Sequence, residues 1–160
     1  MKIIDILRHT YDCLCVGCAV ASGEISPPGE IIAATPSFVL HQDPEVPIKG
    51  FLIVASRQHI RSIADMRRKE AAECFNLVYR ARMALRNLKD IRDVSIIQEE
   101  RSPHFHIWLR PHYEWMDDRF DHSLSTLRAV NQYARENRNT VENIQEILAA
   151  VELIRNAVKE

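Results

Sequence analysis

The chain has 160 residues, of which 46% are hydrophobic and 27% are charged, and its formal net charge is -1. This length suits a single domain that buries a stable core, and the near-neutral charge excludes binding of DNA or RNA through a broad basic surface. Residues 1–8 mix charged with apolar side chains, and no apolar run approaches the roughly 18 residues of a membrane helix. We therefore expect a cytoplasmic protein, without a membrane partner, that holds a small ligand in a local pocket.

The first half of the chain predicts a short helix followed by three strands. Residues 2–11 are expected to form one or two helical turns that lead into a cluster of cysteines. Two short strands, 31–34 and 37–40, flank a turn. After the proline-containing loop 42–47, the apolar run 50–55 predicts a buried strand.

A long helix and a strand pair follow. The period becomes helical over residues 65–87, and two strands are predicted at 94–98 and 104–110, joined by a short charged loop. The expected apolar face of the helix consists of Ala71, Phe75, Val78, Ala81 and Leu85. This order of elements favours an α+β fold, in which an antiparallel sheet of about five strands carries the long helix on one face.

The last part of the chain predicts a helical extension. Residues 123–135 and 141–158 are expected to form two helices, with Asn139 and Glu142 as an N-cap pair. An apolar stripe on the second helix must pack on another element; it consists of Ile144, Leu148, Val151 and Val158.

The four cysteines are unevenly spaced. Cys13, Cys15 and Cys18 lie close together, while Cys74 stands alone in the helical pattern. In a reducing compartment, neighbouring cysteines more often bind a metal, or have no role, than form disulfides. Cys74 is expected to pack in the core as a small hydrophobic residue.

The segment 102–111 carries the residues with the clearest chemistry. Because side chains alternate along a strand, His104, His106 and Trp108 are expected to share one face. The opposite, core face receives Phe105, Ile107 and Leu109. Two imidazoles then lie side by side on the open face, which favours a functional role, although a single strand histidine is often only a satisfied surface or core residue.

Three separated segments resemble the motifs of the histidine triad family. His104-Phe105-His106-Ile107 resembles the start of the triad signature, in which histidines alternate with hydrophobic residues. The Cys-Val-Gly-Cys segment at 15–18, followed by Ala-Val-Ala-Ser-Gly-Glu-Ile, resembles the family's N-terminal opening. Residues 50–59, Gly-Phe-Leu-Ile-Val-Ala-Ser-Arg-Gln-His, are similar to the strand that ends in the family's Lys-x-His. The resemblance covers roughly residues 13–111.

The resemblance implies a nucleotide-binding domain with the histidine triad fold over residues 1–112. Residues 113–160 form the C-terminal helical extension, packed on the same domain or on a dimer partner. Family members commonly pair as homodimers through the long helix and an edge strand, so a homodimer is expected here. Tyr113 and Trp115 either close over a ligand or begin the packing of the extension.

The resemblance also implies a structural zinc site. Many relatives bind zinc with four residues, which correspond here to Cys15, Cys18, His59 and His104. Two thiolates and two imidazoles suit tetrahedral Zn²⁺ with no open position. Cys13 is a spare thiol able to compete for the metal, and a metal-free cluster of reduced cysteines is the alternative.

In this family the middle histidine attacks the α-phosphorus of a nucleotide and forms a nucleotidyl-histidine, which water hydrolyses. That position is His106. Its tautomer must be fixed by an acceptor, and the resemblance implies the backbone carbonyl of His104. Gln98, Arg101 and Ser102, with nearby backbone N–H groups, are the expected donors to the phosphate.

The remaining nucleotide contacts are carried over in the same way. Asp43 corresponds to an acidic residue that accepts hydrogen bonds from the ribose hydroxyls, although an Asp in such a loop also serves turn chemistry. Ile53 and Val20 are expected as apolar walls for the base, or as core residues. Trp108 completes the expected nucleotide-binding set.

Two departures from the family pattern bear on activity. Trp108 replaces the third histidine, and a tryptophan donates one hydrogen bond but relays no proton. Phe51 replaces another histidine of the family strand. The related galactose-1-phosphate uridylyltransferase branch replaces the third histidine with glutamine and still uses the middle one, so His106 remains the expected nucleophile.

The expected activity is cleavage of a phosphoanhydride or phosphoramidate at the α-phosphate of a nucleotide, with dinucleoside polyphosphates or nucleoside phosphoramidates as substrates. A catalytically degenerate nucleotide-binding or interaction module is the alternative that Trp108 and Phe51 favour. A catalytic metal on His104 and His106 is disfavoured, because residues 107–110 supply none of the further ligands it needs.

Overall fold

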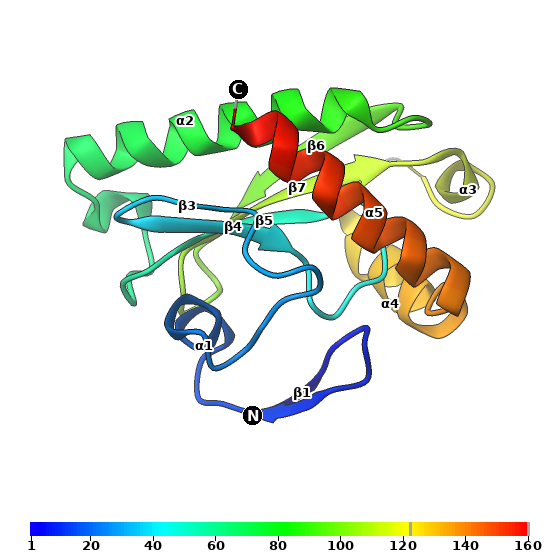
Figure 1. Cartoon of the computed structure of the whole chain (residues 1–160), viewed down its shortest axis with the longest axis horizontal. Helices are drawn as coiled ribbons and strands as arrows, with labels where there is room; N and C mark the ends of the chain where they lie inside the picture. Colours follow the sequence, from blue (N-terminus) through cyan, green and yellow to red (C-terminus); the bar gives the residue numbers. More distant parts are fainter. Residues whose placement is uncertain (122, 160) are drawn as a thin grey trace.

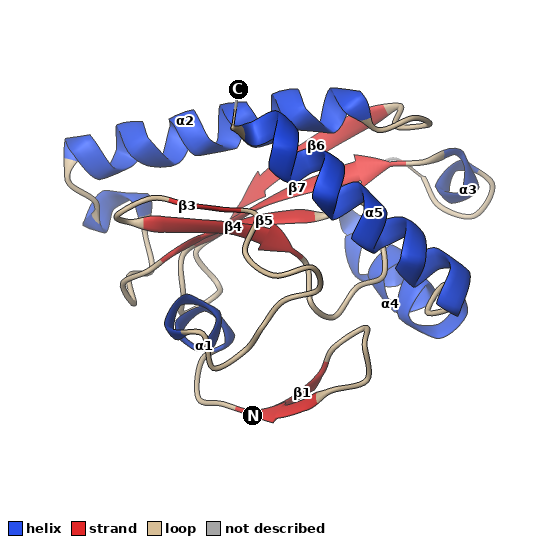
Figure 2. Cartoon of the chain, viewed as in Figure 1, coloured by secondary structure: helices blue, strands red, loops and turns tan. Residues whose placement is uncertain are grey.

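A computed structural model describes residues 1–121 and 123–159 of the chain. Its centre is a five-stranded antiparallel sheet in the order β3-β4-β5-β7-β6 (Figures 1 and 2). The strands are β3 Ala33–Ala34, β4 Phe38–Gln42, β5 Leu52–Ser56, β6 Asp93–Gln98 and β7 His106–His112. The α+β fold expected from the sequence, with one antiparallel sheet, is confirmed.

The two faces of the sheet are covered by different helices. The long helix α2 (Arg68–Ala84) lies over one face, and the short helix α1 (Val16–Ser22) lies on the other side (Figure 1). Short 3-10 helices at Ile63–Asp65 and Leu85–Asn87 flank α2. Alternate strand residues therefore enter two separate cores, because successive side chains of a strand point to opposite faces.

The α2 side holds the larger core. Sheet residues that pack under α2 are Phe38, Leu40, Leu52, Val54, Phe105 and Leu109. Under α1, the strands contribute Val39 and Ala55, which pack with Val20. The alternation predicted for the last strand is thus observed for Phe105 and Leu109, which are fully buried on the α2 side.

The apolar face predicted for α2 is wrong at Phe75. Phe75 is 74% exposed, whereas Cys74, Leu77 and Val78 are buried. The buried stripe follows i, i+3 and i+4 from Cys74 and keeps Val78, Ala81 and Leu85 of the predicted face, so its centre is displaced toward Cys74 and Leu77. Cys74 packs in the core as expected, and burial raises the pKa of its thiol to about 11.

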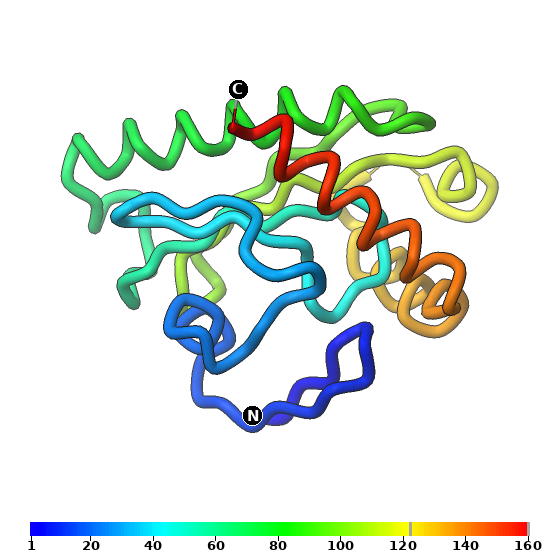
Figure 3. Tube along the Cα trace, viewed as in Figure 1, coloured from blue at the N-terminus to red at the C-terminus, as the bar shows by residue number. Residues whose placement is uncertain are grey.

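The predicted N-terminal helix is wrong. The segment forms a hairpin of β1 (Lys2–Ile4) and β2 (Thr10–Asp12), seen as the blue loop below the sheet in Figure 3. The carboxylate of Asp5, which is 2% exposed, accepts hydrogen bonds from the backbone N–H of His9 at 2.8 Å and lies 3.0 Å from its Nδ1. Arg8 adopts a left-handed conformation with φ 70. A buried carboxylate and a left-handed residue close a turn that a helix does not accommodate.

The C-terminal extension packs on the same chain. It comprises α3 (Glu114–Asp117), a 3-10 helix at Leu124–Thr126, α4 (Leu127–Asn137) and α5 (Val141–Val158). Helix α5 crosses α2 and adds Ala150, Val151, Ile154 and Val158 to the main core (Figure 1). His122 and Glu160 of the expected extension lie outside the described residues. Among the described helices, none has the length and apolarity to cross a bilayer.

Two details of the extension differ from the prediction. The N-cap of α5 is Thr140, whose hydroxyl accepts a hydrogen bond from the backbone N–H of Asn143 at 3.2 Å, rather than Asn139 with Glu142. Helix α4 begins at Leu127 rather than at residue 123. It packs with Val46, Ile48 and Phe51 in a third apolar cluster at the end of the sheet.

A matched pair of leucine substitutions tests this packing. Leu77→Ala in α2 is expected to lower the free energy of unfolding by about 2–5 kcal/mol, because Leu77 is 1% exposed and its removal leaves a cavity. Leu153→Ala in α5 is expected to change it by less than about 0.5 kcal/mol, because Leu153 is 54% exposed. Urea unfolding followed by circular dichroism measures both, and equal losses would contradict the assignment of faces.

Candidate functional site

The register of β4, β5 and β7 places the expected site residues on the α1 side of the sheet. Ala55 is paired with His106, and Ile53 is paired with both Trp108 and His41. Directly paired residues of antiparallel strands share a face. His106, Trp108, Ile53 and His41 therefore form one continuous floor.

His104 lies just before β7 rather than within it, because β7 begins at His106. The backbone of the neighbouring Phe105 is nevertheless fixed on both sides. Its N–H donates to the carbonyl of Ile60 at 2.7 Å, and its carbonyl accepts from the N–H of Ser56 at 3.2 Å. The His104 side chain is 4% exposed and turns toward α1.

Cys15, Cys18, His59 and His104 converge at this point. Their ligand atoms all lie within 4.8 Å of one another. Nδ1 of His104 is 3.3 Å from Sγ of Cys15, 3.5 Å from Sγ of Cys18 and 3.4 Å from Nδ1 of His59. Nδ1 of His59 is 3.2 Å from Sγ of Cys18. Residues separated by up to 89 positions thus meet in one group.

These separations fit tetrahedral zinc. With Zn–S bonds of about 2.3 Å and Zn–N bonds of about 2.0 Å, neighbouring ligand atoms lie about 3.3–3.8 Å apart. Nε2 of His104 donates to the carbonyl of Ser56 at 2.7 Å, so the lone pair of Nδ1 faces the thiolates. Cys13 packs in the α1-side core with Ile3, outside this group, which removes it as a competitor for the metal.

Gly17 allows this approach. A Cβ atom on Gly17 would lie 2.4 Å from Cδ2 of the His104 ring. That distance is an overlap, and the ring would have to move to relieve it. The glycine between the two cysteines therefore fits the close packing of α1 on His104. The sequence shows that Gly17 lies between the two cysteines, but only the structure shows that it contacts the ring of His104.

His106 is held in one tautomer. Its Nδ1 is 3.0 Å from the backbone carbonyl of His104, and because a carbonyl only accepts, Nδ1 carries the hydrogen. The lone pair of the neutral ring is then on Nε2. This is the hydrogen bond that the family resemblance implies for His106.

A cavity of about 460 Å³ opens over His106. Asp43, Ile53, Ser102 and Trp108, all expected as nucleotide contacts, line it. From α1 and the loop before it come Leu14, Cys15, Val16, Gly17 and Val20. Asp43, Pro44 and Glu45, from the loop after β4, also line the cavity. The structure therefore brings most of the expected site residues into one cavity between α1 and the sheet.

Gln98 and Arg101 are not brought to this cavity. Gln98 is paired with Ile107, whose side chain packs on the α2 side, so Gln98 belongs to the face opposite His106. The structure therefore does not bring Gln98 beside His106, and its expected role at the phosphate has no support from this geometry. Arg101 is exposed in the loop, where its Nε lies 3.8 Å from the carboxylate of Glu99. A one-residue difference in strand register is enough to exchange the two faces.

Asp43 and Ser102 line the cavity but also stabilise their own loops. Oδ1 of Asp43 accepts from the backbone N–H of Glu45 at 2.8 Å and of Val46 at 2.9 Å. Burial raises the pKa of the Asp43 carboxyl to about 6. The Ser102 hydroxyl donates to the His104 carbonyl at 3.1 Å. Ser102 therefore supports the same carbonyl that orients His106.

The two departures from the family pattern pack against each other. Phe51 is fully buried, and its ring meets that of Trp108 edge to face at 5.6 Å. Trp108 also packs on the apolar cluster under α4, and its ring lies 5.5 Å from that of His106. Tyr113 donates to the carbonyl of Lys49 at 2.6 Å and lines a separate cavity, as does Trp115. These two aromatic residues therefore begin the extension and do not line the His106 cavity.

Sequence reasoning missed His41. Its side chain is 2% exposed, lines the cavity, and has Nδ1 2.8 Å from the carbonyl of Gln42. Desolvation lowers the pKa of His41 to about 4. The only signal in the sequence was its position at the end of a buried strand, two residues before Asp43.

The sheet, α1 and α2 define an α+β class of fold, and comparison with solved structures shows which fold it is. A histidine triad family protein from Bacillus anthracis is 19% identical over 89% of this chain and 97% of its own, with a TM-score of 0.58. A zinc-bound histidine triad family protein from Mycobacterium smegmatis is 18% identical over 90% and 97%, with a TM-score of 0.57. A hypothetical histidine triad nucleotide-binding protein from Sulfolobus tokodaii is 12% identical over 91% and 92%, with a TM-score of 0.60.

The chain therefore has the histidine triad fold. At these identities the likeness establishes the fold alone. No protein-family model matches the sequence, and no curated protein matches it.

Substitution of Gly17 tests the metal site. Gly17→Ala is expected to reduce bound zinc to well below one ion per chain and to lower the unfolding temperature, because the new methyl group displaces the His104 ring. Alanine favours a helix over glycine by about 1 kcal/mol, so helix propensity alone predicts the opposite change in stability. Metal analysis by mass spectrometry and thermal unfolding measure both effects.

Ser22→Ala, at an exposed position of the same helix, is the control and is expected to keep its zinc. Full zinc occupancy with unchanged unfolding in the Gly17 variant would contradict the site.

Proposed function

We propose that this protein is a zinc-stabilised histidine triad enzyme that cleaves a nucleotide at its α-phosphate, with His106 as the nucleophile. The observation that carries the proposal is the fixed tautomer of His106, whose Nδ1 bonds to the His104 carbonyl at the floor of a cavity of nucleotide size. The likeness in fold to a histidine triad nucleotide-binding protein supports it.

The reaction has two steps. Nε2 of His106 attacks the α-phosphorus, a P–N bond to the ring forms, and the bond from phosphorus to the leaving group breaks. Water then attacks the same phosphorus, the P–N bond breaks, and the nucleoside monophosphate and free His106 are released. In the first step the leaving group takes up a proton from solvent as its bond to phosphorus breaks. In the second step the hydroxyl of water bonds to phosphorus, and the other proton of that water goes to solvent.

The zinc ligands act on this reaction through position. Cys15, Cys18, His59 and His104 would hold Zn²⁺, which would supply a structural crosslink with no open coordination position. His104 joins that site to the nucleophile, because its ring belongs to the metal group and its carbonyl orients His106.

The charge of the cavity favours phosphoramidates over polyphosphates. Asp43 and Glu45 contribute carboxyl groups to the lining, and the described lining residues include neither lysine nor arginine. A polyphosphate leaving group brings several negative charges into this setting, whereas the amine of a phosphoramidate brings none. The expected substrate class is therefore a nucleoside phosphoramidate.

The four free cysteines favour a reducing compartment, which agrees with a cytoplasmic location.

A binding module without turnover is the second candidate. Trp108 and Phe51 occupy the positions of two family histidines and pack on each other, so neither offers a proton to the leaving group. Nucleotide binding without cleavage would then remain as the function of the same cavity.

Substitution of the nucleophile distinguishes these candidates. His106→Ala is expected to reduce AMP release from adenosine phosphoramidate by about a thousandfold or more, because no other described group takes the place of Nε2. An alkaline denaturant quench of a reaction with radiolabelled α-phosphate is expected to trap label on the wild-type protein and none on the variant. Zinc content and unfolding temperature serve as controls and are expected to stay unchanged.

Equal turnover by the two proteins would contradict the mechanism. Binding of AMP without any cleavage by the wild-type protein would favour the binding module.

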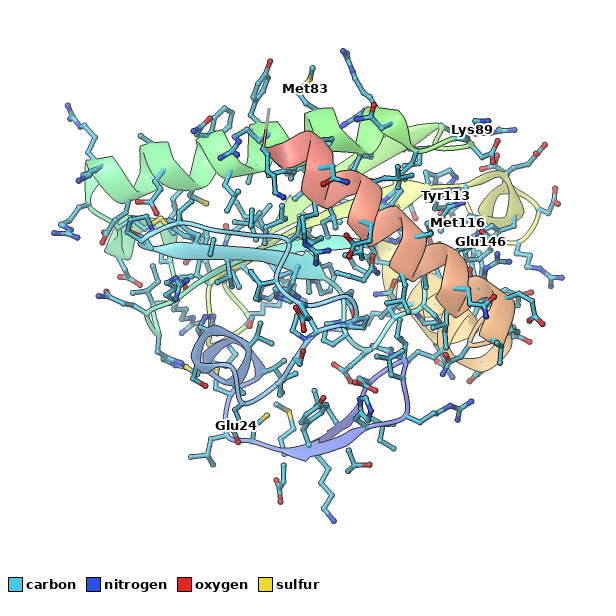
Figure 4. All side chains as sticks on the ribbon, in the orientation of Figure 1. Glu24, Met83, Lys89, Tyr113, Met116 and Glu146 are labelled. Carbon is cyan, nitrogen blue, oxygen red and sulfur yellow. The ribbon has the colours of Figure 1, made fainter. Side chains whose placement is uncertain are left out.

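We also propose that the chain forms a homodimer through α2 and the edge strand β6. Phe75, Tyr79 and Met83 are four residues apart, form one stripe along α2, and are 74%, 58% and 38% exposed. Figure 4 shows Met83 projecting from the side of α2 that faces away from the sheet. β6 ends the sheet, and within the described chain only β7 pairs with it. An exposed apolar stripe beside an open strand edge fits a second copy of the chain.

Light scattering of purified protein tests the dimer. Tyr79→Glu is expected to convert the dimer to a monomer, because it buries an unpaired charge in the interface. Val141→Glu, which changes an equally exposed apolar residue at the start of α5, is the control and is expected to leave the dimer intact. A wild-type monomer, or a dimer in both variants, would contradict the proposed interface.

A further inference from the structure

His41 is a buried polar residue that the proposed reaction does not use. It is 2% exposed, comes from β4, and lines the cavity two strands away from His106. The intervening strand β5 contributes Ile53, which is paired with His41 on one side and with Trp108 on the other. The cavity floor thus has His106 on β7, the apolar side chain of Ile53 on β5, and the imidazole of His41 on β4.

The hydrogen bonds of His41 define what it offers to a ligand. Its Nδ1 donates to the carbonyl of Gln42 at 2.8 Å, because a carbonyl only accepts. The neutral ring then carries a lone pair on Nε2. Burial keeps the ring neutral over the physiological range, since it lowers the pKa to about 4. His41 therefore presents an acceptor, not a donor.

Nε2 of His41 is available to a ligand. Among the described residues it has no hydrogen-bond partner. Nε2 of His41 is not among the described side-chain atoms that are both without a hydrogen-bond partner and fully enclosed, so part of its surface is accessible. A nitrogen that is neither paired nor fully enclosed, on a side chain that lines the cavity, faces the space where a ligand binds.

The position of His41 suits a base rather than a phosphate. Neighbouring strands are about 4.8 Å apart, so His41 lies about 9.6 Å across the sheet from the strand of His106. A nucleotide with its phosphate over β7 places its sugar and base over β5 and β4. The apolar side chains of Ile53 and Val20 border that end of the cavity and suit the faces of a base.

We propose that His41 selects adenine, by accepting a hydrogen bond from the exocyclic amine of the base at Nε2. The proposal rests on the proposed function for its placement of the phosphate. Guanine, hypoxanthine, uracil and cytosine all carry a carbonyl oxygen, and burial of an unpaired carbonyl is costly. Adenine is the base without one. An acceptor in an apolar wall therefore suits adenine best.

Equilibrium binding to the wild-type protein tests this without any variant. Titration calorimetry compares AMP, IMP and purine riboside monophosphate, which carry an amine, a carbonyl and a hydrogen at carbon 6 of the ring; IMP also carries a hydrogen on N1. AMP is expected to bind about tenfold more tightly than purine riboside monophosphate, which lacks the donor. It is expected to bind about a hundredfold more tightly than IMP, whose carbonyl faces the lone pair.

A variant assigns the preference to the side chain. His41→Phe keeps an aromatic ring and removes the acceptor, so AMP and purine riboside monophosphate are expected to bind equally. Equal binding of AMP and IMP by the wild-type protein, or an AMP preference that persists in the variant, would overturn the role of His41 while the nucleotide site stands. No binding of any of the three would overturn the proposed function together with this assignment.

Discussion

The position of His104 is the constraint on which the rest of the site depends. Its ring Nε2 is fixed by the Ser56 carbonyl, its Nδ1 faces Cys15 and Cys18, and its own carbonyl orients His106. The ring of this one residue therefore belongs to the Cys/His group, while its carbonyl holds the ring of His106. A zinc ion on the four Cys and His side chains would therefore also fix the ring of His106, through the backbone of the residue two positions before it.

Backbone carbonyls set the chemistry of three histidines in this cavity. Ser56 sets the tautomer of His104, the carbonyl of His104 sets that of His106, and that of Gln42 sets that of His41. Each imidazole then presents one lone pair in a defined direction. Carbonyls of a packed sheet and its adjoining loops are rigid, so these roles depend on the fold rather than on charged partners.

The C-terminal extension completes the fold instead of adding a separate unit. Helix α5 supplies four residues to the core beneath α2, and α4 forms an apolar cluster with Phe51 and Trp108. The two residues that depart from the family pattern, Phe51 and Trp108, are thus the ones that contact this apolar cluster. The Phe51 ring is buried and the Trp108 ring is partly buried in this cluster, which includes Val130 and Ala134 of α4.

The sequence by itself predicted the antiparallel sheet, because strand periodicity is local, and its resemblance to the histidine triad motifs predicted the four Cys and His residues that the structure brings together. It failed for residues 2–11, where the buried carboxylate of Asp5 decides the turn, and for Phe75, where the rotation of α2 depends on the sheet below. Only the tertiary structure decided that Gln98 faces away from His106 and that His41 faces the cavity. The register of β6 on β7 sets the first and that of β4 on β5 sets the second, and a shift of one residue in either pairing exchanges the two faces.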